Sequence, residues 1–218
     1  MKKVADTFIM IRHVWFDFSD TIAGIDHDIH DHIKYNAFAE QTGLSDSPAQ
    51  RQKYDELYLK HGRSNANVFV REFATASKYW SELLDSRKSE IYSLADPNIP
   101  GVLSELAELV PISVFSNVDT EAIMQTLGID TSLFSHILSS AELRYPKPHV
   151  EGYKRLIELS HAPASEILYI GDTEVKDILP AKSIGLQTGM IWGVSKEATY
   201  NFTDFEDIIH QLKGKIRT

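Results

Sequence analysis

The sequence predicts an α/β fold in which a parallel sheet is interrupted by an all-helical insertion. Residues 102–212 alternate between short apolar runs and stretches with helical spacing, which is typical of βαβ units. A further apolar run, Val14–Phe16, lies well ahead of this series and indicates a buried strand. Residues 26–94, between the two, show helical spacing and no convincing strand. We therefore expect a core formed by residues 1–23 and 95–218, with residues 24–94 as the insertion.

Composition limits the classes of function. The chain has 218 residues, of which 43% are hydrophobic and 24% are charged, enough for a packed core. Its net charge of −9 without a long basic run argues against nucleic acid as a partner, and more weakly against an anionic membrane surface. The absence of cysteine excludes a disulfide, a thiolate metal site and a Cys nucleophile. No apolar run approaches the ~20 residues that a membrane span needs, so no membrane association is expected.

The N-terminal stretch carries basic and apolar residues but no small-residue cleavage site. We therefore expect no signal peptide and a cytoplasmic location. Met10 is an alternative start to Met1, because the residues after it lead directly into the first strand. Residues 1–9 are expected to be loosely held.

About four helices are expected in the insertion. Apolar residues recur at helical spacing from Ile29, and Gly43 ends this first helix. A second helix opens at Pro48, and a glycine-containing loop follows at residues 61–65. Two further helices are predicted at Val68–Phe73 and Tyr79–Leu94.

After Pro100, strands and helices alternate. The predicted strands are Pro111–Phe115, Ile137–Leu138, Ile167–Ile170 and Gln187–Trp192, and the predicted helices are Val102–Leu109, Glu121–Leu127, Pro148–Leu159, Val175–Ile184 and Asp207–Leu212. Right-handed crossovers place the carboxyl ends of such strands at one edge, where ligands bind in open parallel sheets. The insertion leaves the core at that edge and is therefore placed to act as a lid.

Polar residues follow three of the predicted strands. Asp17 follows the first, Ser116 and Asn117 follow the second, and Asp172 follows the strand that begins at Ile167. Lys147 precedes a helix whose N-terminus is expected at the same edge. Two neighbouring carboxylates without a cation would repel each other, and one would stay protonated. Oxygen ligands with room for water suit magnesium, so the sequence predicts a Mg²⁺ site at this edge.

Four segments together resemble the motifs of the haloacid dehalogenase superfamily of aspartyl-nucleophile hydrolases. They are FDFSDT at residues 16–21, VFSN at 114–117, YPKP at 145–148 and YIGDTEVKD at 169–177. Their order and spacing agree with the family, and the insertion lies where the family's helical cap lies. The resemblance covers nearly the whole chain beyond residue 12. It implies a Rossmann-like core with a helical cap, as in the phosphoglycolate phosphatase-like branch.

The resemblance also implies how the first and fourth motifs act. Asp17 would be the nucleophile and would form an aspartyl-phosphate, which divides one difficult hydrolysis into two steps. Asp172 would bind Mg²⁺ together with Asp17 and the backbone carbonyl of Ser19. Asp177 would orient Lys147 or a metal-bound water, or supply a further ligand.

The second and third motifs would act on the phosphoryl group. Lys147 would neutralise charge on Asp17 and on the transferred group. Ser116, with backbone N–H groups near Asn117, would hold phosphoryl oxygens. Phosphoryl transfer depends mostly on positioning and charge stabilisation, which this set supplies.

Ser19 departs from the family pattern. Phosphatases of this family usually carry Asp two residues after the nucleophile, where it protonates the leaving group and then deprotonates the attacking water. Loss of such a general acid/base costs roughly 10²–10⁴ in rate. Asp20 is adjacent, but successive residues point to different sides, so we do not expect it to substitute.

Several activities are compatible with Ser19. One is a slow phosphatase, or one whose leaving group needs little protonation, such as an acyl phosphate or a phosphoanhydride. A phosphotransferase with a persistent phosphoenzyme is a second. A phosphonate-cleaving relative would use Lys53 or Lys60 as a Schiff base, but Lys147 stands where such enzymes carry arginine. A phosphate-compound binding protein without turnover is the last. The Gly171-Asp172 motif argues against a dehalogenase.

Two features of the insertion are further candidates. Residues 27–32, HDIHDH, could form a metal site, although a polar first turn of a helix is the simpler interpretation. Arg63, in the 61–65 loop, could bind a carboxylate or phosphate of the substrate, or could simply face solvent. We expect a magnesium-dependent hydrolase, monomeric or homodimeric, that transfers the phosphoryl group of a small phosphorylated metabolite to Asp17 and then to water.

Overall fold

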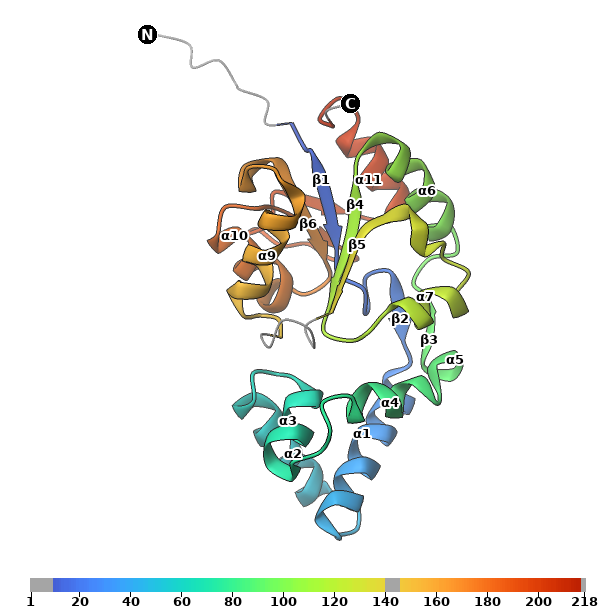
Figure 1. Ribbon diagram of the computed structural model, residues 1–218, viewed down its shortest axis with the longest axis vertical. Coiled ribbons are helices and arrows are strands. Elements are labelled where there is room, and N and C mark those ends of the chain that lie inside the picture. The colour runs from blue at the N-terminus through green and yellow to red at the C-terminus, as the bar shows by residue number, and fades with distance from the viewer. Residues whose placement is uncertain (1–9, 140–145, 217–218) are drawn as a thin grey trace.

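The structure, a computed structural model, describes residues 10–139 and 146–216 (Figure 1). Its centre is a six-stranded sheet with the order β5-β4-β1-β6-β7-β8, in which every neighbouring pair is parallel. The strands are β1 (His13–Phe16), β4 (Ile112–Ser116), β5 (Phe134–Ser139), β6 (Ile167–Gly171), β7 (Gln187–Ile191) and β8 (Tyr200–Phe202). The predicted α/β fold with a Rossmann-like parallel sheet is confirmed.

Strand β1 lies between β4 and β6, and all four of its side chains are buried. Alternate side chains of a strand point to opposite faces of a sheet, so a run of four apolar or weakly polar residues needs cover on both faces. Val14 and Phe16 belong to the larger apolar cluster, whereas Trp15 belongs to a second cluster. The uninterrupted apolar or weakly polar character of β1 therefore explains its position in the interior of the sheet.

Helices cover both faces of the sheet (Figure 1). One face carries α6 (Ile99–Leu109), α7 (Glu121–Thr126) and α11 (Phe205–Leu212), and the other carries α9 (Val150–Ser160) and α10 (Leu179–Ser183). Short 3₁₀ turns at Thr131–Leu133 and Ala164–Glu166 precede β5 and β6. Within the described residues, no helix combines the length and the apolar character needed to span a membrane.

The insertion contains α1 (His27–Thr42), α2 (Pro48–Lys60), α3 (Asn65–Phe73), α4 (Tyr79–Asp85) and α5 (Lys88–Ile91). The first three begin where the side chains of Asp26, Ser47 and Ser64 each accept an N–H of the first turn. The helices meet in an aromatic cluster in which the ring centroids of Phe69 and Trp80 are 5.8 Å apart. This helical segment lies beyond the carboxyl end of β1 (Figure 1).

The prediction of no strand within residues 26–94 is wrong. Strand β3 (Tyr92–Leu94) pairs antiparallel with β2 (Ala23–Ile25), so that Ile25 lies opposite Tyr92. The single helix expected at Tyr79–Leu94 is accordingly divided into α4, α5 and β3. The pairing partner is almost 70 residues away, and such a contact overrides local helical spacing.

Other differences are smaller. Strand β8 at the sheet edge was not predicted, because Tyr200–Phe202 is too short to show a period. Strand β5 extends on both sides of Ile137–Leu138. The helix expected from Pro148 begins at Val150, where His149 caps it. The helix expected at Val175–Ile184 starts as a π-helical turn, Glu174–Ile178, before α10. The expectation for residues 1–9 lies outside the described residues.

Candidate active site

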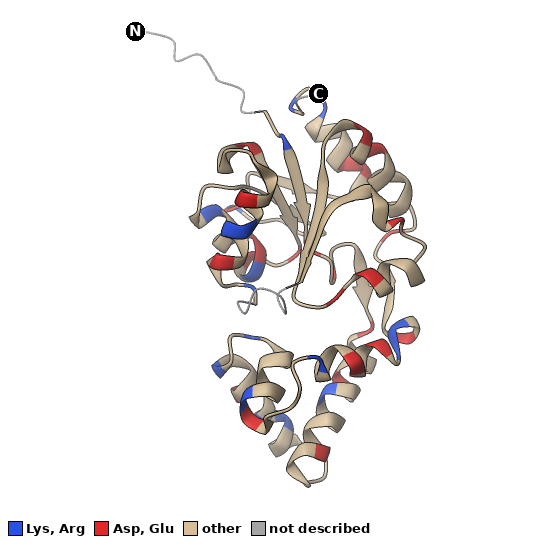
Figure 2. Ribbon diagram, in the orientation of Figure 1, with Lys and Arg blue, Asp and Glu red and all other residues tan. Residues whose placement is uncertain are grey.

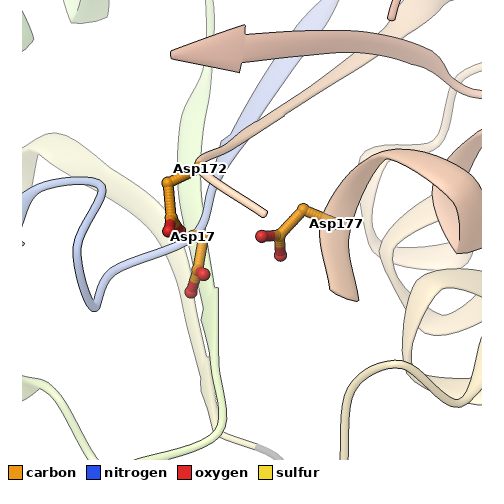
Figure 3. Close-up of side chains that lie close together, drawn as sticks. All are labelled: Asp17, Asp172 and Asp177. Carbon is orange, nitrogen blue, oxygen red and sulfur yellow. The ribbon is translucent and has the colours of Figure 1, made fainter. Parts of the chain in front are cut away.

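The carboxylates of Asp17, Asp172 and Asp177 converge at the carboxyl edge of the sheet (Figure 3). Asp17 follows β1, and its backbone N–H donates to the carbonyl of Ile170 in β6 at 2.8 Å. Asp172 follows β6 directly, so the pairing of β1 with β6 brings these two residues together. One carboxylate oxygen from each of the three residues lies within 4.8 Å of the others.

Lys147 lies among these carboxylates and is 2% exposed. Its Nζ is 2.6 Å from Oδ1 of Asp17 and 2.8 Å from Oδ1 of Asp177. It also donates to the hydroxyl of Tyr169 at 3.1 Å. The backbone of Lys147 is held by the side chain of Asn117, which accepts its N–H at 2.8 Å and donates to its carbonyl at 3.2 Å. Asn117 therefore fixes the segment that carries Lys147.

Asp177 is fully buried, and both of its oxygens are used. Oδ1 faces Lys147, and Oδ2 accepts the N–H of Thr173 at 3.1 Å. Asp177 is part of the π-helical turn that follows β6, and π-turns inside helices often occur at functional sites. This geometry directs Asp177 towards Lys147, which is one of the roles that the sequence predicts for it.

The charges at this site do not balance. Three carboxylates face one ammonium group among the residues just described. Burial, together with the charges of Asp177 and Asp172, raises the pKa of Asp17 to about 7 against the opposing effect of Lys147. Burial also raises the pKa of Asp172. Burial alone would lower the pKa of Lys147, but Asp17 and Asp177 outweigh it and raise that pKa. An added cation would therefore favour the ionised carboxylates.

The FDFSDT segment turns sharply after Asp17. Asp20 has a left-handed φ of 59°, and its N–H donates to the carbonyl of Ala23 at 2.7 Å. Its Oδ1 accepts the N–H of Ile25 at 3.1 Å, and its Oδ2 is 3.3 Å from Nε2 of His27. These contacts use the Asp20 carboxylate to hold the turn, although Asp20 also lines the cleft. That Asp20 does not replace an acid at Ser19 stays a prediction.

Two threonines next to the motif aspartates were missed by the sequence prediction. Thr21 donates its hydroxyl to Oδ1 of Asp172 at 3.2 Å, and Thr173 donates to Oδ2 at 2.9 Å. Both lie within the motif segments, so their position was a usable signal. Tyr169 opens the fourth motif segment, but its place in a buried strand predicts a core residue and not a contact with Lys147.

A cleft of about 310 Å³ separates the sheet edge from the helical segment. The predicted site residues that line it are Asp17, Ser19, Arg63, Ser116, Asn117, Lys147 and Asp172, whereas the buried Asp177 lies behind Lys147. Ser116 is 1% exposed and uses its Oγ to accept the N–H of Val118 at 3.2 Å. Basic and acidic residues occur both in the helical segment and in the part of the chain that contains the sheet (Figure 2).

The other sequence candidates do not join the cluster around Asp17, although His27, His30 and Asp31 of the HDIHDH segment line the cleft. Neither Lys53 nor Lys60 lines the cleft, and Lys60 pairs with Glu72 at 2.7 Å. The HDIHDH segment does not form a three-ligand metal cluster; over residues 10–139 and 146–216, such a cluster occurs at Asp17, Asp172 and Asp177. His30 instead packs edge-on against Trp80, with ring centroids 5.3 Å apart.

Comparisons with known proteins agree with this geometry. Residues 11–185 match the family model for haloacid dehalogenase-like hydrolases. The chain is 27% identical to a haloacid dehalogenase-like hydrolase domain-containing protein of Danio rerio over 207 residues, covering 82% of this chain and 84% of the relative. It is 31% identical to a glyceraldehyde 3-phosphate phosphatase of Methanocaldococcus jannaschii over 96 residues, covering 41% and 42% of the two chains.

The fold is also found among solved structures. A phosphatase of the same superfamily from Thermococcus onnurineus superposes with a TM-score of 0.71 at 18% identity, covering 95% of this chain and 100% of that one. This likeness bears on the fold, whereas the family model spans all four motif segments. The chain belongs to the haloacid dehalogenase-like hydrolase family.

Proposed function

We propose that this hydrolase is a magnesium-dependent phosphatase that acts on a small phosphorylated metabolite through an aspartyl-phosphate at Asp17. The observation that carries the proposal is the contact of Lys147 with both Asp17 and Asp177, at 2.6 Å and 2.8 Å, at the floor of the cleft. A buried carboxylate held against a single ammonium group is suited to bind and attack an electrophilic phosphoryl group.

The residues present fit magnesium. Asp17 and Asp172 offer carboxylate oxygens and Ser19 a backbone carbonyl, and oxygen ligands are those that Mg²⁺ prefers. The excess of negative charge and the raised pKa of Asp17 give the site a physical reason to take up a cation. When bound, Mg²⁺ would supply positive charge for the phosphoryl oxygens.

The chain's own residues would then carry the reaction. Asp17 attacks phosphorus, and Lys147 stabilises the charge on the transferred group. Ser116 and the backbone N–H groups near Asn117 hold phosphoryl oxygens. Water then attacks the aspartyl-phosphate and restores Asp17. We further propose that residues 24–94 act as the cap that closes the cleft and excludes water.

Ser19 supports a second candidate function. Without an acid/base at this position, the phosphoenzyme would persist, which is what a phosphotransferase or a binding protein with impaired turnover requires. The contacts of Asp20 with Ile25 and His27 favour this alternative over full replacement of the missing carboxylate.

The test is turnover of 4-nitrophenyl phosphate with magnesium, with EDTA, and in Asp17→Asn. The phosphatase proposal expects activity that EDTA abolishes and that Asp17→Asn lowers by at least ~10³-fold, since the nucleophile is lost. The matched control is Asp28→Asn, an exposed position on α1 outside the cleft lining. Full activity of Asp17→Asn would exclude the proposal. Magnesium-dependent phosphorylation of Asp17 without turnover would favour the second candidate.

A further inference from the structure

Among the residues that the structure describes, four lysine and arginine side chains line the cleft, and they differ in whether a carboxylate pairs with them. They are Lys34, Arg63, Lys147 and Lys176. Lys34 pairs with Asp31 at 2.6 Å, and Lys147 pairs with Asp17 and Asp177. Within the described parts of the chain, Arg63 and Lys176 have no carboxylate within ion-pair distance. These two cations are therefore available to an anion in the cleft.

Both cations are carried by segments whose backbone is held in place. The N–H of Arg63 donates to the carbonyl of Tyr58 at 2.8 Å, and Ser64 next to it caps α3. Lys176 lies in the π-helical turn after β6, where its carbonyl accepts the hydroxyl of Tyr153. Its Nζ is 3.5 Å from the hydroxyl of Tyr58, the residue of α2 whose carbonyl accepts the backbone N–H of Arg63. Both residues line the cleft, Arg63 from the helical segment and Lys176 from the turn after β6.

Ser19 lines the same cleft but does not offer an acidic side chain that could protonate a departing oxygen. An alkoxide leaving group needs that proton, because it is a strong base. A phosphate or carboxylate leaving group departs as a stable anion and needs none. It gains instead from cations placed where its charge develops.

We propose that Arg63 and Lys176 form a binding site for a leaving group that departs as an oxyanion, so that the substrate is a phosphoanhydride or an acyl phosphate. The inference rests on the proposed phosphatase function. An Asp17 oxygen bonds to phosphorus as the bond to the bridging oxygen breaks, and the electron pair leaves with that oxygen. The departing phosphate or carboxylate is then paired with Lys176 and Arg63.

The second step, in which water hydrolyses the aspartyl-phosphate, also balances without a proton donor or acceptor at position 19. The oxygen of water bonds to phosphorus, and the bond between phosphorus and Asp17 breaks with its electron pair returning to the carboxylate. One proton of the water stays on the attacking oxygen, and the other goes to a phosphoryl oxygen of the product. The products are dihydrogen phosphate and the free Asp17 carboxylate.

The experiment compares kcat/KM for pyrophosphate, acetyl phosphate and glycerol 3-phosphate in wild type, Lys176→Met, Arg63→Met and Ser19→Asp. The wild type is expected to prefer one of the first two over glycerol 3-phosphate by at least ~10²-fold, since only the ester needs the missing acid. If pyrophosphate is the better substrate, the leaving group is a phosphate. If acetyl phosphate is the better substrate, the leaving group is a carboxylate. Lys176→Met and Arg63→Met should each lower the preferred rate roughly tenfold, as loss of a charged hydrogen bond does.

The controls separate this site from a structural role. Lys182→Met and Arg71→Met change a lysine and an arginine that do not line the cleft, and they should leave all three rates unchanged. Ser19→Asp should raise the glycerol 3-phosphate rate by roughly 10²-fold or more, because it supplies the missing acid.

Two results would overturn the inference. The first is an equal wild-type kcat/KM on all three substrates. The second is an equal loss of kcat/KM on all three substrates in Lys176→Met, which would mean that Lys176 acts only through its contact with Tyr58. In either case, 4-nitrophenyl phosphatase activity that disappears in Asp17→Asn would leave the proposed function standing. Activity that persists in Asp17→Asn would remove the proposed function and this inference together.

Discussion

Gly171 and Asp177 are packed so closely that a side chain on Gly171 would collide with the carboxylate. A Cβ at this position would lie 2.5 Å from Cγ of Asp177, and real Cβ contacts are never so short. Glycine is therefore required here by proximity, because Gly171 has no unusual φ. The family's Gly-Asp motif thus has a physical reason in this chain: it leaves room for the group that faces Lys147.

Gly171→Ala should displace Asp177 and lower magnesium-dependent turnover at least about tenfold, with a loss of about 1–3 kcal/mol in the free energy of unfolding. The measurement is kcat on 4-nitrophenyl phosphate together with urea unfolding. Gly101→Ala is the control, since a Cβ there meets nothing within 4 Å. Unchanged kcat in Gly171→Ala would show that the position of Asp177 does not matter to the reaction.

Lys147→Met should destabilise the fold, because it leaves the buried Asp17 and Asp177 without their cation. Breaking a buried ion pair by removing one partner costs about 3–5 kcal/mol. Part of that loss should return when Mg²⁺ is added, since a cation that binds the folded state stabilises it. Thermal unfolding with and without magnesium measures both effects. A variant as stable as wild type in EDTA would contradict the charge balance inferred for this site.

Asp20→Gly should be tolerated. Asp20 adopts a left-handed φ of 59°, which glycine reaches without strain, while the lost contact to Ile25 offsets that gain. We expect kcat within about threefold of wild type and stability within about 1 kcal/mol. Asp20→Val, which cannot adopt this φ easily, should lose at least about 1 kcal/mol. A fall in kcat of ~10²-fold in Asp20→Gly would instead make Asp20 a proton carrier in the reaction.

The parts of the fold that sequence could predict are those whose signal is local. Val14–Phe16 is continuously apolar and is followed by Asp17, so this short stretch of sequence predicts a buried strand with a polar residue after it. The pairing of Ile25 with Tyr92 depends on two segments that are distant in sequence, and neither segment shows a strand period by itself. Local spacing therefore favoured helix up to Leu94 and missed β3.

The residues of the candidate site also differ in whether the local sequence predicts them. Asp17, Lys147 and Asp172 could be named from motif spacing, and the structure brings them together. Lys176 could not, because a lysine in a helical turn normally faces solvent. Its significance comes from the π-helical turn and from the helical segment across the cleft, both of which are tertiary features.

His13 should make the fold sensitive to acid. It is the buried first residue of β1, contacts Oγ of Ser113 through Nε2 at 2.8 Å, and stacks near His136. Burial, followed by the charge of His136, lowers the pKa of His13 from 6.5 to about 4. The folded state thus keeps His13 neutral between these values while the unfolded chain takes up a proton. The free energy of unfolding therefore falls as the pH drops from about 6.5 towards about 4.

Replacement of His13 by glutamine removes this titration and retains a hydrogen-bonding group for Ser113. The stability advantage of wild type over His13→Gln should shrink by about 2 kcal/mol between pH 7 and pH 5, as expected for a pKa lowered by this amount. Urea unfolding at both pH values measures it, with the exposed His210→Gln as the control. Other groups that titrate, including the partly buried His30, are common to both proteins and cancel in the difference. A constant difference between wild type and His13→Gln would mean that the pKa of His13 is the same in the folded and unfolded states, which its burial and the nearby His136 argue against.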